Sequence, residues 1–360
     1  MARAIRPGLP KGTIGLALFV ILSIALLIAF APAGRDTARA AGLSLLAPLP
    51  DAVPPGTTLI VGDPVTEWIF SHNGWEAELP FAIKWARITG GPDVTEAFHA
   101  RALDVGMGAN VPPLHAHWVG LPVRIVAVRG RADPVATPAF VWATSPKAGV
   151  TALSDLKGKR IAFSPSQVQG QIVIQTLRSL GLTTKDVTLV ELPSSVGGDV
   201  YTSALSSGIV DAAPIGGGIV AERYLRKFGD AGARVLRHPP FRDDLITAFV
   251  PVHVLEDPAK AAALRHYVRW WGRAQAWAAA HPAELARGYY EGDQGLSPAD
   301  ARMVVAAAGT PVVPAEWREA AAYQQAAIDL LAPQFGRERF DAATLFDRRF
   351  EPLAHEGSQP

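Results

Sequence analysis

Four neutral hydrogen-bonding side chains lie in one short loop of this sequence. They are Ser164, Ser166, Gln167 and Gln169, and the loop joins an apolar run to a helical pattern over residues 171–180. The first turn of a helix presents unpaired N–H groups and the positive end of the helix dipole, which favour an anionic group. Because the loop contains no lysine or arginine, backbone amides and these side chains are the groups expected to bind such an anion. The alternative is that the two serines only cap the helix.

Two other loops that follow apolar strands carry further candidate ligand residues. Asp63 and Thr66 come directly after the run 58–62, and Gly108 and Asn110 come at the end of a second strand. Ligands of open α/β sheets bind beyond the carboxyl ends of the strands, where the loops run into helices. We therefore expect both loops to meet the serine-containing loop at a cleft, with Asn110 facing it from the other side.

A triple glycine, Gly216-Gly217-Gly218, follows the strand-like run 209–215. Glycine lets the backbone approach a ligand closely, so Gly216 and Gly217 are candidate ligand residues. A flexible turn after the strand is an equally good explanation.

The sequence offers little for catalysis or for metal binding. It has no cysteine, and no nucleophile, base and orienting residue occur at a recognisable spacing. His115 and His117 form an H-x-H pair, but after two prolines the segment is expected to be helical, where residues two apart diverge. We therefore expect a protein that is not an enzyme, with no catalytic residue, no metal site and no cofactor.

The first forty residues have the pattern of a secretory signal. Three basic residues, Arg3, Arg6 and Lys11, precede an uncharged run over 15–31, and Ala38-Arg39-Ala40 supplies small residues at a spacing that a signal peptidase accepts. We expect residues 1–40 to be a cleaved signal peptide and the protein to be periplasmic. The alternative is an uncleaved membrane anchor, because the apolar run is at the lower limit for spanning a bilayer.

Removal of residues 1–40 takes away five basic residues and one acidic residue, which changes the formal net charge from +1 to −3. Nothing in the rest of the chain forms a basic face with interleaved aromatic residues, so nucleic acid is excluded as a partner. The remainder, about 320 residues long, normally divides into two cores. Without cysteines, both cores must be stabilised by burial and not by disulfides.

From residue 57 the chain alternates short apolar runs with helical stretches, which is typical of doubly wound α/β domains. The stretch 204–213 repeats the design of 100–106, a helix end followed by a small residue and a strand with an aspartate. Two extended apolar stretches, 139–144 and 246–254, are expected to cross between the two halves. After the second of these stretches, 246–254, the chain is expected to be helical to its end.

The predicted organisation therefore has a first lobe of residues 57–142 plus 246–350 and a second lobe of residues 143–245. Each lobe is expected to contain a doubly wound sheet. A helical C-terminal section is expected to complete the first lobe.

Three motifs resemble one known family. They are VGMGANVPP at 105–113, VTALSDLKGKRIAF at 150–163 and WAAAHPAE at 277–284. In this order they resemble the substrate-binding proteins of sulfonate, taurine and nitrate ABC importers, the NMT1/THI5-like group, which has a type II periplasmic-binding fold. The resemblance runs from about residue 57 to residue 350. The D-L-K-G segment is the motif that indicates a type II binding lobe.

This resemblance implies an extracytoplasmic protein that delivers a small organic or anionic solute, such as a sulfonate, taurine or nitrate, to an ABC transporter permease in the inner membrane. The protein is expected to be a monomer. The alternatives are an enzyme on the same fold, of the precursor-synthase or desulfinase kind, and a membrane-tethered ligand-sensing domain.

The chain departs from the family at three of the candidate positions. Asn110 stands where the family usually has threonine, the triple glycine replaces an aromatic and acidic pair, and Asp63 would repel a deeply bound anion.

The pattern of the first forty residues makes a direct prediction about processing. The exported protein should begin at Ala41, because the A-R-A site ends at residue 40. Mass spectrometry of the exported protein measures this. Recovery of the intact chain, extracted only by detergent, would indicate the tethered form instead.

Overall fold

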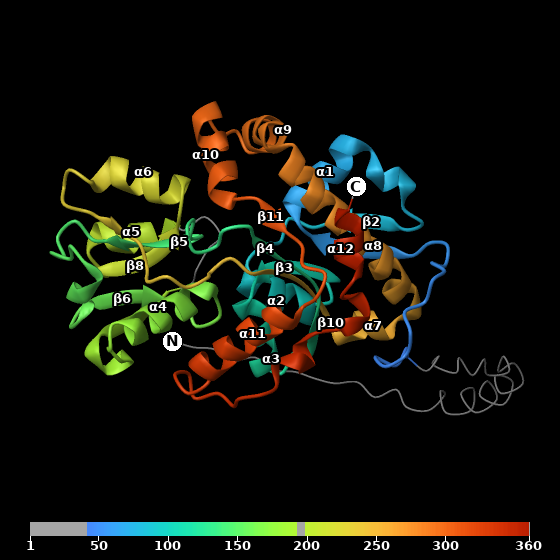
Figure 1. Cartoon of the computed structure of the whole chain (residues 1–360), viewed down its shortest axis with the longest axis horizontal. Helices are drawn as coiled ribbons and strands as arrows, with labels where there is room; N and C mark the ends of the chain where they lie inside the picture. Colours follow the sequence, from blue (N-terminus) through green and yellow to red (C-terminus); the bar gives the residue numbers. More distant parts are fainter. Residues whose placement is uncertain (1–41, 193–198, 360) are drawn as a thin grey trace, which may run out of the picture. The chain divides into compact units, whose positions relative to one another are not determined.

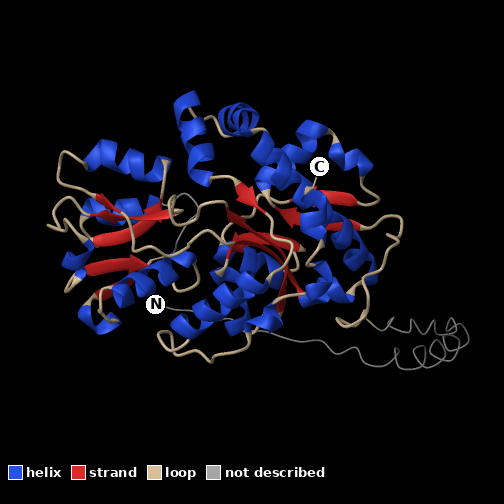
Figure 2. Ribbon diagram, in the orientation of Figure 1, coloured by secondary structure: helices blue, strands red, loops and turns tan. Residues whose placement is uncertain are grey.

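The computed structural model describes residues 42–192 and 199–359, and from residue 43 onward these form two α/β lobes (Figure 1). The predicted signal peptide lies outside the described residues. Helices lie on either side of each sheet (Figure 2). The first lobe is defined here by a six-stranded sheet and the second lobe by a five-stranded sheet.

The sheet of the first lobe has the order β11-β4-β10-β3-β1-β2. Strand β1 is parallel to β2 and β3, whereas β10 is antiparallel to both β3 and β4. Alternate residues of β1, such as Leu59 and Val61, are fully buried. The strands are β1 (Thr58–Gly62), β2 (Ala82–Trp85), β3 (Val105–Ala109), β4 (Val123–Arg131), β10 (Ile246–Pro251) and β11 (Pro311–Val312).

The sheet of the second lobe repeats this arrangement with the order β7-β6-β8-β5-β9. Here β6 is parallel to β7 and β8, and β5 is antiparallel to β8 and β9. In both sheets, the strand that arrives from the other lobe is therefore inserted antiparallel beside the third strand. The strands are β5 (Phe140–Thr144), β6 (Arg160–Phe163), β7 (Thr188–Glu191), β8 (Ala212–Gly216) and β9 (Val235–Leu236).

Helices α1, α2 and α3 belong to the first lobe, and α4, α5 and α6 to the second. The C-terminal section adds helices that pack mainly on the first lobe, which include a π-helix, η4. The bounds are α1 (Pro64–Asn73), α2 (Gly91–His99), α3 (Val111–Trp118), α4 (Val168–Ser179), α5 (Asp199–Ser207), α6 (Ile219–Phe228), α7 (Val252–Glu256), α8 (Pro258–Ala280), α9 (Pro282–Leu285), η4 (Ala286–Asp293), α10 (Pro298–Ala308), α11 (Arg318–Leu331) and α12 (Leu353–Ser358). Short 3₁₀ turns are η1 (Trp75–Glu78), η2 (Leu153–Leu156), η3 (Thr184–Asp186), η5 (Ala342–Leu345) and η6 (Arg348–Phe350).

The repeated aspartate of the two halves has the same structural role in each lobe. Asp104, just before β3, accepts a hydrogen bond from the Ile60 backbone N–H at 2.9 Å and pairs with Lys260 at 2.6 Å. Asp211, just before β8, accepts from the Arg160 backbone N–H at 2.8 Å and pairs with the Arg160 guanidinium at 2.8 Å. Each carboxylate thus fixes the third strand of its sheet to the first strand.

The two crossings lie just before the stretches that the sequence analysis assigned to them. Residues 140–144 are strand β5 inside the second sheet, and residues 246–251 are strand β10 inside the first. The connecting segments are therefore 132–139 and 237–245. The apolar character of 139–144 and 246–254 reflects burial inside a sheet and not exposure between lobes.

Two adjacent acids of the second crossing hold both ends of the first crossing. Asp243 accepts hydrogen bonds from the backbone N–H groups of Ala139 at 2.9 Å and Phe140 at 2.7 Å, where the first crossing enters the second lobe. Asp244 accepts from the Arg131 N–H at 2.6 Å, where the first crossing leaves β4. We call this pair of acids the Asp243–Asp244 clamp.

Both clamp carboxylates are fully buried, and each has a cationic or ring partner. His238 Nε2 lies 3.2 Å from Asp243 Oδ2, and Arg242 Nε donates to Asp244 Oδ1 at 2.9 Å. A buried carboxylate is tolerated only when it is paired and hydrogen-bonded in this way.

Replacing Asp243 by alanine should therefore lower the free energy of unfolding by about 3 to 5 kcal/mol. Two partly buried N–H groups would lose their acceptor, and the buried His238 ring would lose its partner. Asp230→Ala is the matched control, since Asp230 is exposed, and it should change stability little. Urea unfolding of both variants measures the difference. Equal midpoints for the two variants would contradict a stabilising role for the clamp.

Candidate functional site: a cavity between the lobes

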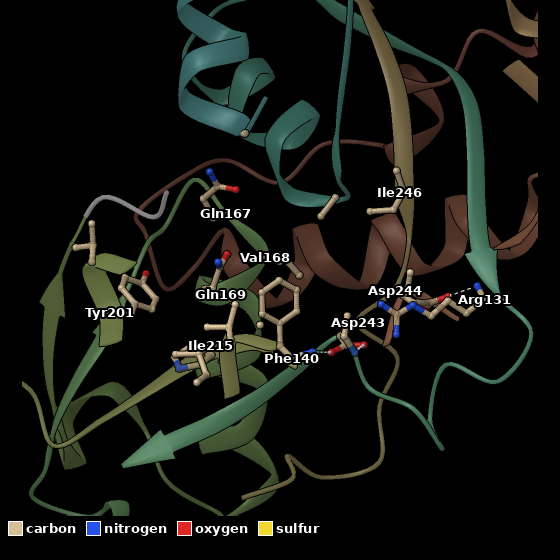
Figure 3. A pocket seen from close by; sticks show the side chains of 18 of the residues that line it. Arg131, Phe140, Gln167, Val168, Gln169, Tyr201, Ile215, Asp243, Asp244 and Ile246 are labelled. Atoms are coloured by element: carbon tan, nitrogen blue, oxygen red, sulfur yellow. Dashed lines mark hydrogen bonds between the residues drawn. The ribbon is translucent and has the colours of Figure 1, made fainter. Parts of the chain in front are cut away.

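A cavity of about 320 Å³ lies between the two lobes, against the Asp243–Asp244 clamp (Figure 3). The first lobe contributes the ends of β3 and β4 and the start of β10 to its wall. The second lobe contributes the start of β5, the end of β8 and the N-terminus of α4. We call it the interlobe cavity.

The N-terminus of α4 forms one wall of the interlobe cavity. Gln167, Val168 and Gln169 line it, as the close view shows (Figure 3). The Gln167 side chain makes no capping hydrogen bond to the helix, so it does not occupy the positive end of the helix dipole. This end therefore favours a bound anion.

Arg129, near the end of β4, lines the same cavity. Its guanidinium is half-buried, and among the described residues it has no hydrogen-bond or ion-pair partner. Burial lowers the pKa of Arg129, and the nearby carboxylate of Asp63 opposes that shift. An arginine remains charged in proteins and presents a planar fork of donors that matches carboxylate, sulfonate or phosphate oxygens. A half-buried, unpaired arginine in a cavity lacks an acceptor for its N–H groups, and an anionic ligand would supply one.

The acids in the cavity wall are already satisfied. Asp243 and Asp244 line it but accept hydrogen bonds from three backbone N–H groups and lie beside His238 and Arg242. Their negative charge is therefore stabilised by partners within the Asp243–Asp244 clamp. The polar groups left for a ligand include Arg129, the α4 N-terminus, the Gln167 side chain and the Tyr201 hydroxyl. The Tyr201 hydroxyl is buried and has no partner among the described residues.

A second cavity of about 340 Å³ lies within the first lobe, beneath α8, η4 and α10. It shares Arg129, Ile246 and Ala308 with the interlobe cavity, so the two adjoin. We call it the inner cavity. Asp63 and Thr66 line it.

Asp63 is the N-cap of α1, and its carboxylate oxygens already accept hydrogen bonds from protein groups. Its carboxylate accepts from the Thr66 N–H at 3.1 Å and hydroxyl at 2.7 Å, and Trp271 Nε1 donates to it at 3.3 Å. Burial raises the pKa of Asp63, while the Thr66 hydrogen bonds and the Arg129 charge oppose the rise.

The structure divides the ten predicted ligand residues into three groups. Gln167, Gln169 and Gly216 line the interlobe cavity. Asp63 and Thr66 line the inner cavity. The residues that line neither cavity are Gly108, Asn110, Ser164, Ser166 and Gly217.

Asn110 faces the second lobe, as expected, but its side chain is paired there with protein. It is buried, and its Nδ2 donates to Gln171 Oε1 of α4 at 2.7 Å. Gln171 Nε2 in turn donates to the Tyr323 hydroxyl at 3.0 Å, and Gln324 Nε2 donates to the Asn110 carbonyl at 2.8 Å. This network joins α3, α4 and α11.

The remaining predicted residues have structural partners. The hydroxyls of Ser164 and Ser166 lie 3.3 Å apart. The Gly108 carbonyl accepts from the Thr247 hydroxyl at 3.2 Å. The Gly217 N–H donates to the Ala139 carbonyl at 2.8 Å, and a Cβ at Gly217 would lie 3.3 Å from that oxygen, so this glycine allows a close approach to the first crossing.

Comparison with known proteins identifies the architecture. Residues 82–232 match the family described as NMT1/THI5 like. The alkanesulfonate-binding protein SsuA from Xanthomonas axonopodis pv. citri, solved bound to MOPS, superposes with a TM-score of 0.67 at 22% identity, over 82% of this chain and 99% of that one. The chain has the type II periplasmic-binding fold. The family resemblance and the fold class predicted from the sequence are confirmed.

Two further relatives show the range of proteins on this fold. A putative aliphatic sulfonates-binding protein of Escherichia coli (strain K12) is 27% identical over 118 residues, which is 32% of this chain and about a third (36%) of that protein. The desulfurization enzyme DSZB has a TM-score of 0.57 at 15% identity, over 84% of this chain and 98% of that one. The type II periplasmic-binding fold therefore occurs in a binding protein and in an enzyme.

Sequence reasoning missed Arg129, Tyr201 and Phe140 as residues of the cavity wall. A signal for Arg129 was present, because it is a charged residue directly after the apolar run 125–128 of a buried strand. No comparable signal marks Tyr201 or Phe140. Among the described residues, no group of three His, Cys, Asp or Glu side chains is placed to hold a metal ion.

The Asn110–Gln171 pair predicts a measurable coupling between the lobes. Asn110→Ala should lower the free energy of unfolding by about 1 to 3 kcal/mol, because the Gln171 oxygen loses its buried donor. In a Gln171→Ala background the same change should cost much less. Gln175→Ala is the control, because Gln175 is on the same helix and should be additive with Asn110→Ala. Additivity of Asn110→Ala with Gln171→Ala in urea unfolding would rule out the interaction as a stabilising link.

Proposed function

We propose that this protein is an extracytoplasmic solute-binding protein that captures a small organic anion between its lobes and delivers it to an ABC importer. The observation that carries the proposal is the unpaired Arg129 guanidinium in an interlobe cavity that the α4 N-terminus also lines. Both groups attract negative charge. A sulfonate group suits them well, because its three oxygens can accept from the guanidinium fork and from backbone N–H groups at the same time.

Several details of the cavity favour binding over catalysis. The described residues that line the two cavities include no histidine, serine or lysine, and the sequence has no cysteine. The acids in the wall of the interlobe cavity are held by the clamp. Acyl-transfer or desulfinase chemistry requires a free nucleophile and base within hydrogen-bond reach. The Thr66 hydroxyl and the Asp63 carboxylate of the inner cavity lie within reach of each other, but they form the N-terminal cap of α1. An enzyme on the same fold remains the alternative function.

The lobe boundaries suggest how the protein works. We propose that residues 57–142 plus 246–350 and residues 143–245 move as two bodies about the crossings, and that ligand holds them closed. Contacts on two sides of the cavity are compatible with a closed form, because Arg223 of α6 pairs with Asp300 of α10 at 2.8 Å and Asn110 pairs with Gln171. Hinge closure is a common response to ligand in two-domain proteins.

The proposed location is the periplasm, with a monomeric protein that meets a permease in the inner membrane. Export depends on residues 1–40, whose cleavage the mass spectrometry experiment tests. None of the helices in the described part of the chain has the length and apolar character needed to cross a bilayer. A protein that keeps its N-terminal apolar run would be a tethered ligand-sensing domain.

Thermal shift of the mature protein against alkanesulfonates, arylsulfonates, taurine and nitrate tests the proposal. A ligand at a hundred times its Kd should stabilise the protein by about 2.7 kcal/mol. Arg129→Gln should weaken binding of the best anion about tenfold to a hundredfold, because a charge-assisted hydrogen bond is lost.

Arg124→Gln is the matched control. Arg124 is on the same strand, its guanidinium bonds to the Val123 carbonyl, and it does not line the interlobe cavity. Calorimetric affinity should be unchanged in this variant. An Arg129→Gln protein that binds the anion as tightly as the wild type would remove Arg129 from the site.

A further inference from the structure

The inner cavity is a second pocket, and the anion site proposed at Arg129 and the α4 N-terminus leaves it unfilled. It is as large as the interlobe cavity and adjoins it at Arg129 and Ile246. Most of its wall is apolar, with Trp271, Leu285 and Val305 among the lining residues. Small-molecule sites in proteins are clefts or cavities of about 300 to 1,000 Å³, lined mainly by apolar side chains. A cavity of about 340 Å³ in this position is therefore a feature to be explained.

Two polar side chains in this wall lack partners. Gln275 of α8 is buried, and no hydrogen bond of its amide occurs among the described residues. Tyr290 of the π-helix η4 also lines the cavity, and its hydroxyl likewise has no hydrogen-bond partner there. An apolar pocket with a few convergent polar groups is the usual form of a small-molecule site. π-helical turns are frequent at such sites.

We propose, resting on the function proposed above, that the solute has two parts: an anionic head at Arg129 and a bulky apolar body that fills the inner cavity and carries an uncharged polar substituent for Gln275 and Tyr290. The adjoining cavities explain why Arg129 lines both. The head binds on the side of the α4 N-terminus. The body extends beneath α8, away from the second lobe.

The charges of the inner cavity restrict the body further. Asp63 and Arg129 both line it, with opposite formal charges that cancel. The Asp63 oxygens already accept from Thr66 and Trp271, so they offer little to a new donor. Once the head has neutralised Arg129, a second anionic group would meet Asp63. The body should therefore carry no second negative charge. Nitrate and taurine are not the expected main solutes, because neither has a bulky apolar body to fill the cavity.

A series of sulfonates with one head and different bodies tests the inference by calorimetry. The probes are methanesulfonate, naphthalene-2-sulfonate and 6-hydroxynaphthalene-2-sulfonate. Because each buried CH₂-sized group contributes about fourfold in affinity, the naphthalene compound should bind at least about a hundredfold more tightly than methanesulfonate. The hydroxyl should add about fivefold in the wild type through Gln275 or Tyr290, and nothing in a variant that combines Gln275→Leu with Tyr290→Phe.

Variants that fill the inner cavity separate the body from the head. Ala278→Phe on α8 and Ala306→Phe on α10 both project from lining positions, and either should cut the advantage of naphthalene-2-sulfonate over methanesulfonate at least about tenfold. Two sites on different helices guard against one variant that does not fold, which circular dichroism detects. Ala280→Phe is the control, because Ala280 is exposed at the end of α8 and lines neither cavity.

The outcomes distinguish this inference from the proposed function. Equal affinity for the small and the bulky sulfonate, or an unchanged ratio in both filling variants, would overturn the inner-cavity assignment while the anion site stands. Arg129→Gln should weaken all three probes alike. Failure of every sulfonate to bind the wild type would overturn both the proposed function and this inference.

Discussion

The Asp243–Asp244 clamp is the constraint on which the rest of this structure depends. Two adjacent carboxylates on the second crossing accept backbone N–H groups at both ends of the first crossing. The same acids form part of the wall of the interlobe cavity. The segments that join the lobes are thus held together at the place where a ligand would bind. Because each carboxylate is buried and paired, the clamp fixes the crossings without leaving negative charge for the ligand to oppose.

Around this clamp, each sheet follows one rule of construction. The strand that returns from the other lobe, β10 or β5, is inserted antiparallel beside the third strand, and an aspartate at the start of that third strand ties it to the first. This places the carboxyl ends of the parallel strands of both sheets toward the interlobe cavity. Arg129 reaches it from one sheet and the α4 N-terminus from the other. Neither lobe alone supplies both groups.

The sequence was sufficient for the fold class because its signals are local. Each signal lies within a short stretch of the chain. The signals are the alternating apolar runs, the aspartates at 104 and 211, and three short motifs. The site was harder because its residues come from separate elements. The predicted residues Gln167, Gln169 and Gly216 line the interlobe cavity, and each lies at or just beyond the end of a strand, where the sequence pattern is easy to see. Arg129 lies within a strand, and its exposure to a cavity depends on how β10 and α8 pack around it. Asn110 was placed correctly toward the second lobe, but only the register of α4 shows that Gln171 meets it.

Asp63 shows how tertiary packing changes the meaning of a residue. From the sequence alone, an acid in the first loop argues against a deeply bound anion. In the structure its oxygens accept from Thr66 and from Trp271, and Arg129 lies close enough to offset its charge. The acid therefore stabilises the start of α1 and holds Trp271 in the wall of the inner cavity. Its remaining negative potential acts on the body of a ligand, not on a head group on the far side of Arg129. The residue that departs most from the family pattern is then compatible with an anionic head, and it limits what the rest of the solute can carry.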